Sequence, residues 1–140
     1  MIALADLVNF TEEEVIYNLS HNYSGEKSGF DYGEISENDI IIAKKMLQTV
    51  SVLIAYESVG NWGCDSNAFY LLQGKITNEL FEVHASHCSC YGFEGQLDLE
   101  PTTIEALKYR AEKARVFFCG GYDENDEENQ RIINEYILSL

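Results

Sequence analysis

Residues 50–57 read Val-Ser-Val-Leu-Ile-Ala-Tyr-Glu, and this stretch decides the fold. β-Branched and aromatic side chains alternate along it with smaller or polar ones, which is typical of a strand with one buried face. Two similar runs follow at residues 68–72 and 79–85, and the connections between the three runs contain glycine, asparagine and threonine. Short connections of this composition favour hairpins. We therefore expect a three-stranded antiparallel meander.

Helical patterns flank the three runs on both sides. Thr11 followed by three glutamates predicts a capping box and a helix to about residue 22, and apolar residues at helical spacing predict a second helix that ends near residue 48. Pro101 marks the start of a third helix, and a fourth begins near Asp123. The sequence thus predicts a single α+β domain over residues 1–140, in the order α-α-β-β-β-α-α. We expect the helices from both ends of the chain to pack on one face of the sheet.

The charge of the chain limits the classes of partner. Of the 140 residues, 24 are acidic and 9 are basic, which gives a formal net charge of −15. Such a charge repels phosphate backbones and anionic lipid and attracts basic grooves. We therefore expect no direct nucleic-acid binding and no membrane binding, but a partner protein with a basic surface. Because neither a secretory signal nor an apolar run of roughly 20 residues is present, we expect a cytoplasmic protein.

Acidic residues concentrate near the two ends of the chain. Residues 1–40 contain nine acids against one lysine, and residues 116–140 contain six acids against one arginine. If the terminal helices lie side by side, their carboxylates form one negative stripe that imitates a phosphate backbone. The alternative is a solvated surface that serves solubility only. The predicted partner-binding residues are Glu12, Glu13, Glu14, Glu34, Glu37, Asp39, Asp123, Glu124, Asp126, Glu127 and Glu128.

A second group of candidate residues lies around two cysteines. His87, Cys88 and Cys90, with Cys64 as a distant fourth ligand, supply the imidazole and thiolate groups that zinc prefers. Their spacing departs from the paired Cys-x2–4-Cys pattern of structural zinc sites, so the alternative is that the cysteines pack as small buried side chains. A catalytic cysteine activated by His87 is a third interpretation, although no triad context surrounds it. No cofactor is expected apart from this zinc.

Part of the chain resembles small uncharacterised proteins of phage and bacterial genomes. The resemblance rests on residues 66–72 and 80–84 and on residues 87–96, which read His-Cys-Ser-Cys-Tyr-Gly-Phe-Glu-Gly-Gln. It covers about residues 50–110, and the acidic ends lie outside it. The resemblance carries no activity over to the cysteine turn. It implies a phage context, in which small acidic proteins of the anti-CRISPR kind occupy basic surfaces of host nucleases.

Two functions from different classes follow. The first is a non-enzymatic, acidic, DNA-mimicking inhibitor of a host nuclease or another nucleic-acid-binding protein. The second is a small zinc-binding domain or a metal-dependent enzyme that uses the turn from His87 to Cys90. The first requires the carboxylates of both chain ends to gather on one surface, and the second requires the cysteines to converge.

Overall fold

The computed structural model describes residues 1–19, 37–60, 65–87, 93, 96–113 and 125–140, with the backbone alone at Asn38 and Asp39. Within these ranges the chain has the predicted helices and strands and two strands more. One precedes the first helix, and the other follows the meander. The elements are β1 (Ile2–Ala5), α1 (Glu12–Asn18), α2 (Glu37–Leu47), β2 (Val50–Val59), β3 (Ser66–Gly74), β4 (Leu80–His87), β5 (Glu100–Thr102), α3 (Ile104–Glu112) and α4 (Asp126–Leu138).

The strands form one mixed sheet in the order β1-β2-β3-β4-β5. β2, β3 and β4 run antiparallel, β5 adds antiparallel to β4, and β1 lies parallel to β2. The α+β class is thus confirmed, but a sheet of three strands is wrong. The two additional strands are short edge strands. Pro101, predicted to start a helix, lies in β5 instead, where the edge of a sheet tolerates a residue without an N–H group.

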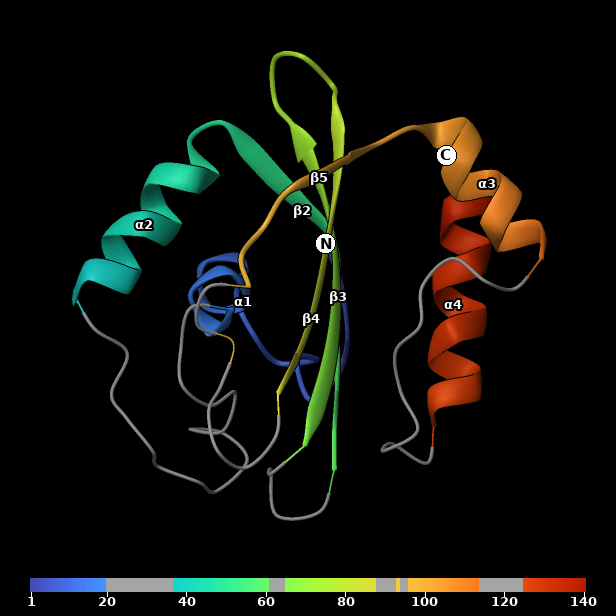
Figure 1. The fold of residues 1–140 in the computed structure, drawn as a ribbon, viewed down its shortest axis with the longest axis horizontal. Helices are drawn as coiled ribbons and strands as arrows, with labels where there is room; N and C mark the ends of the chain where they lie inside the picture. The colour runs from blue at the N-terminus through green and yellow to red at the C-terminus, as the bar shows by residue number, and fades with distance from the viewer. Residues whose placement is uncertain (20–36, 61–64, 88–92, 94–95, 114–124) are drawn as a thin grey trace.

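Helices cover both faces of the sheet, with α1 and α2 on one face and α3 and α4 on the other (Figure 1). The prediction that the helices pack on a single face is therefore wrong. The reason lies in the strands, because neighbouring residues of β2 and β3 are buried on both sides of the sheet. A sheet with two apolar faces needs a helical layer on each of them.

Two hydrophobic clusters correspond to the two faces. One contains α1 and α2 residues such as Val15 and Ala43 packed on sheet residues that include Tyr70 and Leu72. The other contains Leu107 of α3 and Ile133 and Ile137 of α4, packed on sheet residues that include Ile54 and Phe69. The sheet therefore separates α1 from α4. None of the helices in the described ranges has both the length and the apolar character that a bilayer crossing requires.

Local signals explain where the helices begin. Thr11 and Glu14 form the predicted capping box, with the Glu14 N–H donating to the Thr11 hydroxyl at 3.2 Å and the Thr11 N–H donating to the Glu14 carboxylate at 3.0 Å. α3 begins after Thr103, whose hydroxyl accepts the Ala106 N–H at 3.1 Å. These caps fix the entry of the chain into one helix on each face of the sheet.

Candidate functional site

Polar side chains gather at one end of the sheet, where β2 and β4 end and β3 begins. In the strand register, Ser58 lies opposite Asn67, Asn67 opposite Ser86, and Ser66 opposite His87. Since successive residues of a strand point to opposite faces, half of these side chains face α4 and half face α1. We call this region the polar end. It consists of Glu57, Ser58, Ser66, Asn67, Ser86 and His87.

Glu57 is fully buried on the α1 face of the polar end. The Asn18 amide donates to one of its carboxylate oxygens at 2.7 Å, and the Ser66 hydroxyl donates to the other at 2.7 Å. The same amide lies 3.5 Å from the hydroxyl of Tyr70. Burying a carboxyl group is costly unless hydrogen bonds compensate for the lost contact with water. Glu57 therefore fastens the last turn of α1 to β2 and β3.

Asp126 plays the equivalent part on the opposite face. The Tyr56 hydroxyl donates to one of its carboxylate oxygens, and the Ser58 hydroxyl donates to the other at 3.4 Å. Asp126 was predicted to contact a partner, but only 9% of it is exposed. The carboxylate therefore lies inside the protein, where it holds the first turn of α4 against β2.

Glu82 is a third buried carboxylate and connects β4 with α3. Arg110 of α3 donates to one of its oxygens, and Nε2 of His84 lies 3.0 Å from the other. Burial by itself raises the pKa of Glu82, but hydrogen bonds from His84, Arg110 and Thr102 outweigh this effect and lower the pKa to about 2. Glu82 is therefore ionised at neutral pH. Of the four helices in the described ranges, three are thus tied to the sheet through a buried carboxyl group.

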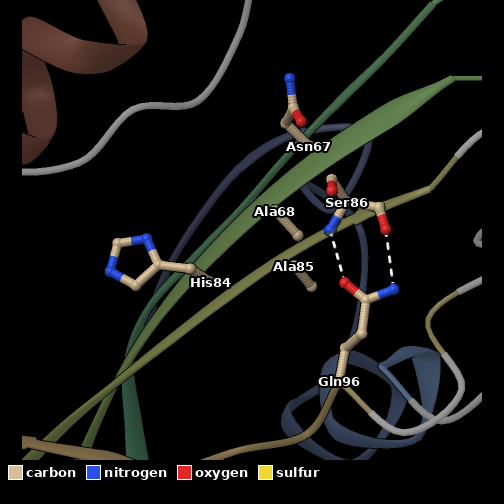
Figure 2. Close-up of a pocket in the computed structure, with 6 residues that line it drawn as sticks. All are labelled: Asn67, Ala68, His84, Ala85, Ser86 and Gln96. Atoms are coloured by element: carbon tan, nitrogen blue, oxygen red, sulfur yellow. Dashed lines mark hydrogen bonds between the residues drawn. The ribbon is translucent and has the colours of Figure 1, made fainter.

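A depression of about 200 Å³ lies beside β4 at the polar end (Figure 2). Because β5 begins only at Glu100, it pairs with the first part of β4 and stops short of Ser86. The side chain of Gln96 takes the place of a strand neighbour there, accepting the Ser86 N–H at 2.8 Å and donating to the Ser86 carbonyl at 2.7 Å (Figure 2). The residues that line the depression are Asn67, Ala68, His84, Ala85, Ser86 and Gln96.

One of the predicted metal ligands, His87, lies at the polar end. His87 is buried at the end of β4, with its ring 4.7 Å edge-on from the fully buried Phe93. Cys64, Cys88 and Cys90 lie outside the described residues. The sequence places Cys64 two residues before Ser66 and Cys88 directly after His87, and these two strand residues are partners in the register. Within the described ranges, no group of three or more potential ligands could hold a metal ion.

Comparison with known proteins gives no relative. No family model, curated protein or solved structure matches the chain. The polar end combines the buried carboxyl group of Glu57 with hydroxyl, amide and imidazole groups. In the described residues, the contacts of these groups fasten helices and close the edge of β4.

The acidic residues predicted for α1 have structural contacts as well. Glu12 accepts the Val52 N–H at 2.8 Å, just beyond the point where pairing between β1 and β2 ends. Glu14 belongs to the capping box, and Glu13 is partly exposed beside them. All three carboxyl groups lie near the positive end of the helix dipole, where acidic side chains stabilise a helix. The first turn of α1 is therefore both a fastening point and an acidic surface.

The acidic residues predicted for the other elements are dispersed. Glu37 is exposed at the start of α2, and Glu127 is exposed at the start of α4. Glu128 pairs with Arg131, whose hydrogen bond lowers the pKa of Glu128, and Arg131 also pairs with Glu135. Outside the part of the structure that is described lie Glu34, Asp123, Glu124 and the side chain of Asp39.

The expected single stripe of carboxylates is not formed by the described helices. α1 and α4, which carry most of its described members, cover opposite faces of the sheet (Figure 1). The prediction assumed that helices from the two ends of the chain lie side by side. The two-faced sheet separates them, so the acidic residues of α1 and α4 belong to two distinct surfaces.

Proposed function

We propose that the protein is a non-enzymatic, acidic binding protein that occupies the basic surface of a partner, such as a nuclease or another nucleic-acid-binding protein. The observation that carries this proposal is the charge balance of 24 acidic and 9 basic residues. Pairing every basic residue with one acid would still leave 24 − 9 = 15 acids. Two of the arginines, Arg110 and Arg131, already bind carboxylates of this chain. The excess negative charge attracts basic grooves and raises the rate of encounter with them.

The arrangement of the helices favours contact through one helical layer. A groove in a partner meets either the α1 surface, with Glu12, Glu13 and Glu14, or the α4 surface, with Glu127 and Glu128, because the sheet lies between them. Among the described residues, the predicted contact carboxylates of each surface span little more than one helical turn. The proposed mechanism is therefore competition with nucleic acid at a small basic site, and not imitation of a long duplex.

Affinity capture from cells of the source organism, followed by mass spectrometry, identifies the candidate partner. The affinity of the purified complex is then measured over a range of salt concentrations, since screening at physiological ionic strength acts over a Debye length of about 8 Å. We expect the affinity to fall steeply as salt rises. A complex insensitive to salt, or the absence of any complex with a basic protein, contradicts the proposal.

Charge reversal on each surface distinguishes the two layers. One variant carries Glu127→Lys and Glu128→Lys on α4, and the matched variant carries Glu13→Lys and Glu37→Lys on α1 and α2. Both change the net charge by the same amount, so the general attraction to a basic partner falls equally. We expect one variant to lose at least about tenfold more affinity than the other. Equal losses would show that no particular layer forms the contact.

A second candidate function is zinc binding by His87, Cys88, Cys90 and Cys64. The pairing of Ser66 with His87 favours it, because Cys64 and Cys88 are close in sequence to these two neighbouring strand positions. Elemental analysis of protein purified under reducing conditions without chelator tests it. We expect one zinc per chain, lost on Cys88→Ser and kept on the control substitution Cys119→Ser. Protein without stoichiometric metal contradicts this function.

A further inference from the structure

An apolar and basic patch lies at the C-terminal end of α2 and on the neighbouring turn between β3 and β4. Three isoleucines of these two segments are exposed, with 57% of Ile41, 39% of Ile42 and 91% of Ile76 accessible. We call these residues the α2 patch. They are Ile41, Ile42, Lys44, Lys45, Lys75 and Ile76.

The turn between β3 and β4 is held firmly against α2. The Lys75 N–H donates to the carbonyl of Thr49 at 2.8 Å, and the Lys75 ammonium donates to the carbonyl of Leu47 at 2.5 Å. These bonds join the strand hairpin to the last turn of the helix. The turn between β3 and β4 is therefore fixed beside the last turn of α2, where Thr49 also lines a hollow.

The charge of the α2 patch is opposite to that of the chain as a whole. Residues 40–56 contain Lys44 and Lys45 and no acidic residue, and Lys75 adds a third positive charge. Lysines in the last turn of a helix also interact favourably with the helix dipole, which is a structural reason for Lys44 and Lys45. That reason does not account for the isoleucines beside them. Lysine and isoleucine together match a ligand that is both acidic and apolar.

A hollow in the α2 patch indicates the kind of ligand. It has a volume of about 480 Å³ and is lined by Ile42, Lys45, Met46, Gln48 and Thr49. Such a hollow accepts a projecting apolar side chain, which a folded or helical peptide segment offers and the flat surface of a bilayer does not. An anionic bilayer would also repel the other charges of a chain whose net charge is −15.

We infer that the α2 patch is a docking surface for an acidic amphipathic segment of a partner protein. An apolar side chain of this segment fills the hollow beside Ile42 and Met46, and its carboxylates pair with Lys44, Lys45 and Lys75. The buried apolar contact supplies most of the affinity, and the surrounding charges select the partner. This surface shares no residue with the proposed acidic contact surfaces. With both in use, the protein would join a basic partner to an acidic one.

The probe is a synthetic helical peptide with leucines along one face and glutamates on the others, labelled for fluorescence anisotropy. A scrambled peptide of the same composition has no continuous apolar face and serves as the control for charge alone. We expect the amphipathic peptide to bind and the scrambled peptide to bind at least about tenfold more weakly. Equal binding of both peptides, or binding of neither, overturns the proposal.

Matched protein variants locate the contact. Lys44→Glu with Lys45→Glu reverses two of the three charges of the α2 patch. Lys108→Glu in α3 with Lys113→Glu at its C-cap makes the same change in net charge on the other face of the sheet. We expect the first variant to lose at least about tenfold in affinity and the second less than about twofold. Equal losses overturn the assignment, since they would reflect general repulsion.

A third variant, Ile42→Ser, tests the apolar contact without changing charge, and its melting temperature reports whether the fold is kept. We expect weaker peptide binding at an unchanged melting temperature. Two further outcomes also overturn the proposal. In one, the wild-type protein binds vesicles that contain anionic lipid and the Ile42→Ser variant does not, which would identify a membrane site. The other is a dimer in sedimentation experiments that Ile42→Ser dissociates, which would identify a second copy of the chain.

Discussion

Replacing Glu82 with glutamine is expected to remove the acid-sensitive part of the attachment of α3 to the sheet. Hydrogen bonds from His84, Arg110 and Thr102 outweigh the effect of burial and hold the pKa of Glu82 at about 2, against an ordinary value of 4.5. At about 1.36 kcal/mol for each pKa unit, this difference corresponds to about 3 kcal/mol of unfolding free energy at neutral pH. Glutamine has a similar shape but no charge, so most of this contribution is lost.

The direction of the pH dependence follows from the lowered pKa. Because the pKa of Glu82 is lower in the folded than in the unfolded protein, its contribution is fully present above a pH of about 4.5 and is lost as the pH falls toward about 2. Wild-type protein and the glutamine variant should therefore differ most at neutral pH. At a pH of about 3, the difference should be less than half as large.

Urea unfolding at neutral pH and at a pH of about 3 measures both quantities. The matched control is Glu79→Gln, which changes an exposed glutamate directly before β4 and should alter the unfolding free energy by less than about 0.5 kcal/mol. The reasoning is refuted if Glu82→Gln unfolds with the wild-type free energy at neutral pH. It is also refuted if the variant keeps the wild-type dependence on pH.

Two further predictions concern the contacts at the polar end. Tyr56→Phe removes the hydroxyl that donates to the buried Asp126 and should lower the unfolding free energy by about 1–3 kcal/mol. The control Tyr109→Phe changes an exposed tyrosine and should leave the unfolding free energy unchanged. Urea unfolding measures both. Gln96→Ala removes two hydrogen bonds to the backbone of Ser86 and should speed hydrogen exchange of the Ser86 amide, as followed by NMR. Unchanged exchange would mean that Gln96 does not protect the edge of β4.

The sequence predicts local structure well where the signal is local. The alternating run over residues 50–57 forms β2, and the capping box at Thr11 starts α1. β1 escapes such reasoning because its partner lies about 50 residues later in the chain. The burial of both faces of the sheet is visible in the sequence of β2. Ile54 and Tyr56 are apolar on one face of the strand, and Leu53 and Ala55 are apolar on the other. A run that is apolar at even and odd positions is typical of a strand buried on both faces.

The candidate site is less accessible to sequence reasoning. Ser58, Asn67 and Ser86 become neighbours only through the register of three strands. The buried carboxylates of Glu57 and Glu82 look like any of the 24 acidic residues, because burial and hydrogen-bond partners depend on contacts between distant elements. Counting acids therefore gives the correct charge but cannot separate the carboxylates that fasten helices from those that face a partner.

The parallel pairing of β1 with β2 has a consequence for folding. β2, β3 and β4 are hairpin neighbours that close short loops, whereas pairing of Ile2 with Ile54 must close a loop of about 50 residues. Contacts of large sequence separation form slowly, so the meander should assemble before β1 joins its edge. β1 leaves the ribosome before β2, so it has to wait for residues 54–57 to be synthesised, and during this interval its apolar side chains lack their partners in the sheet.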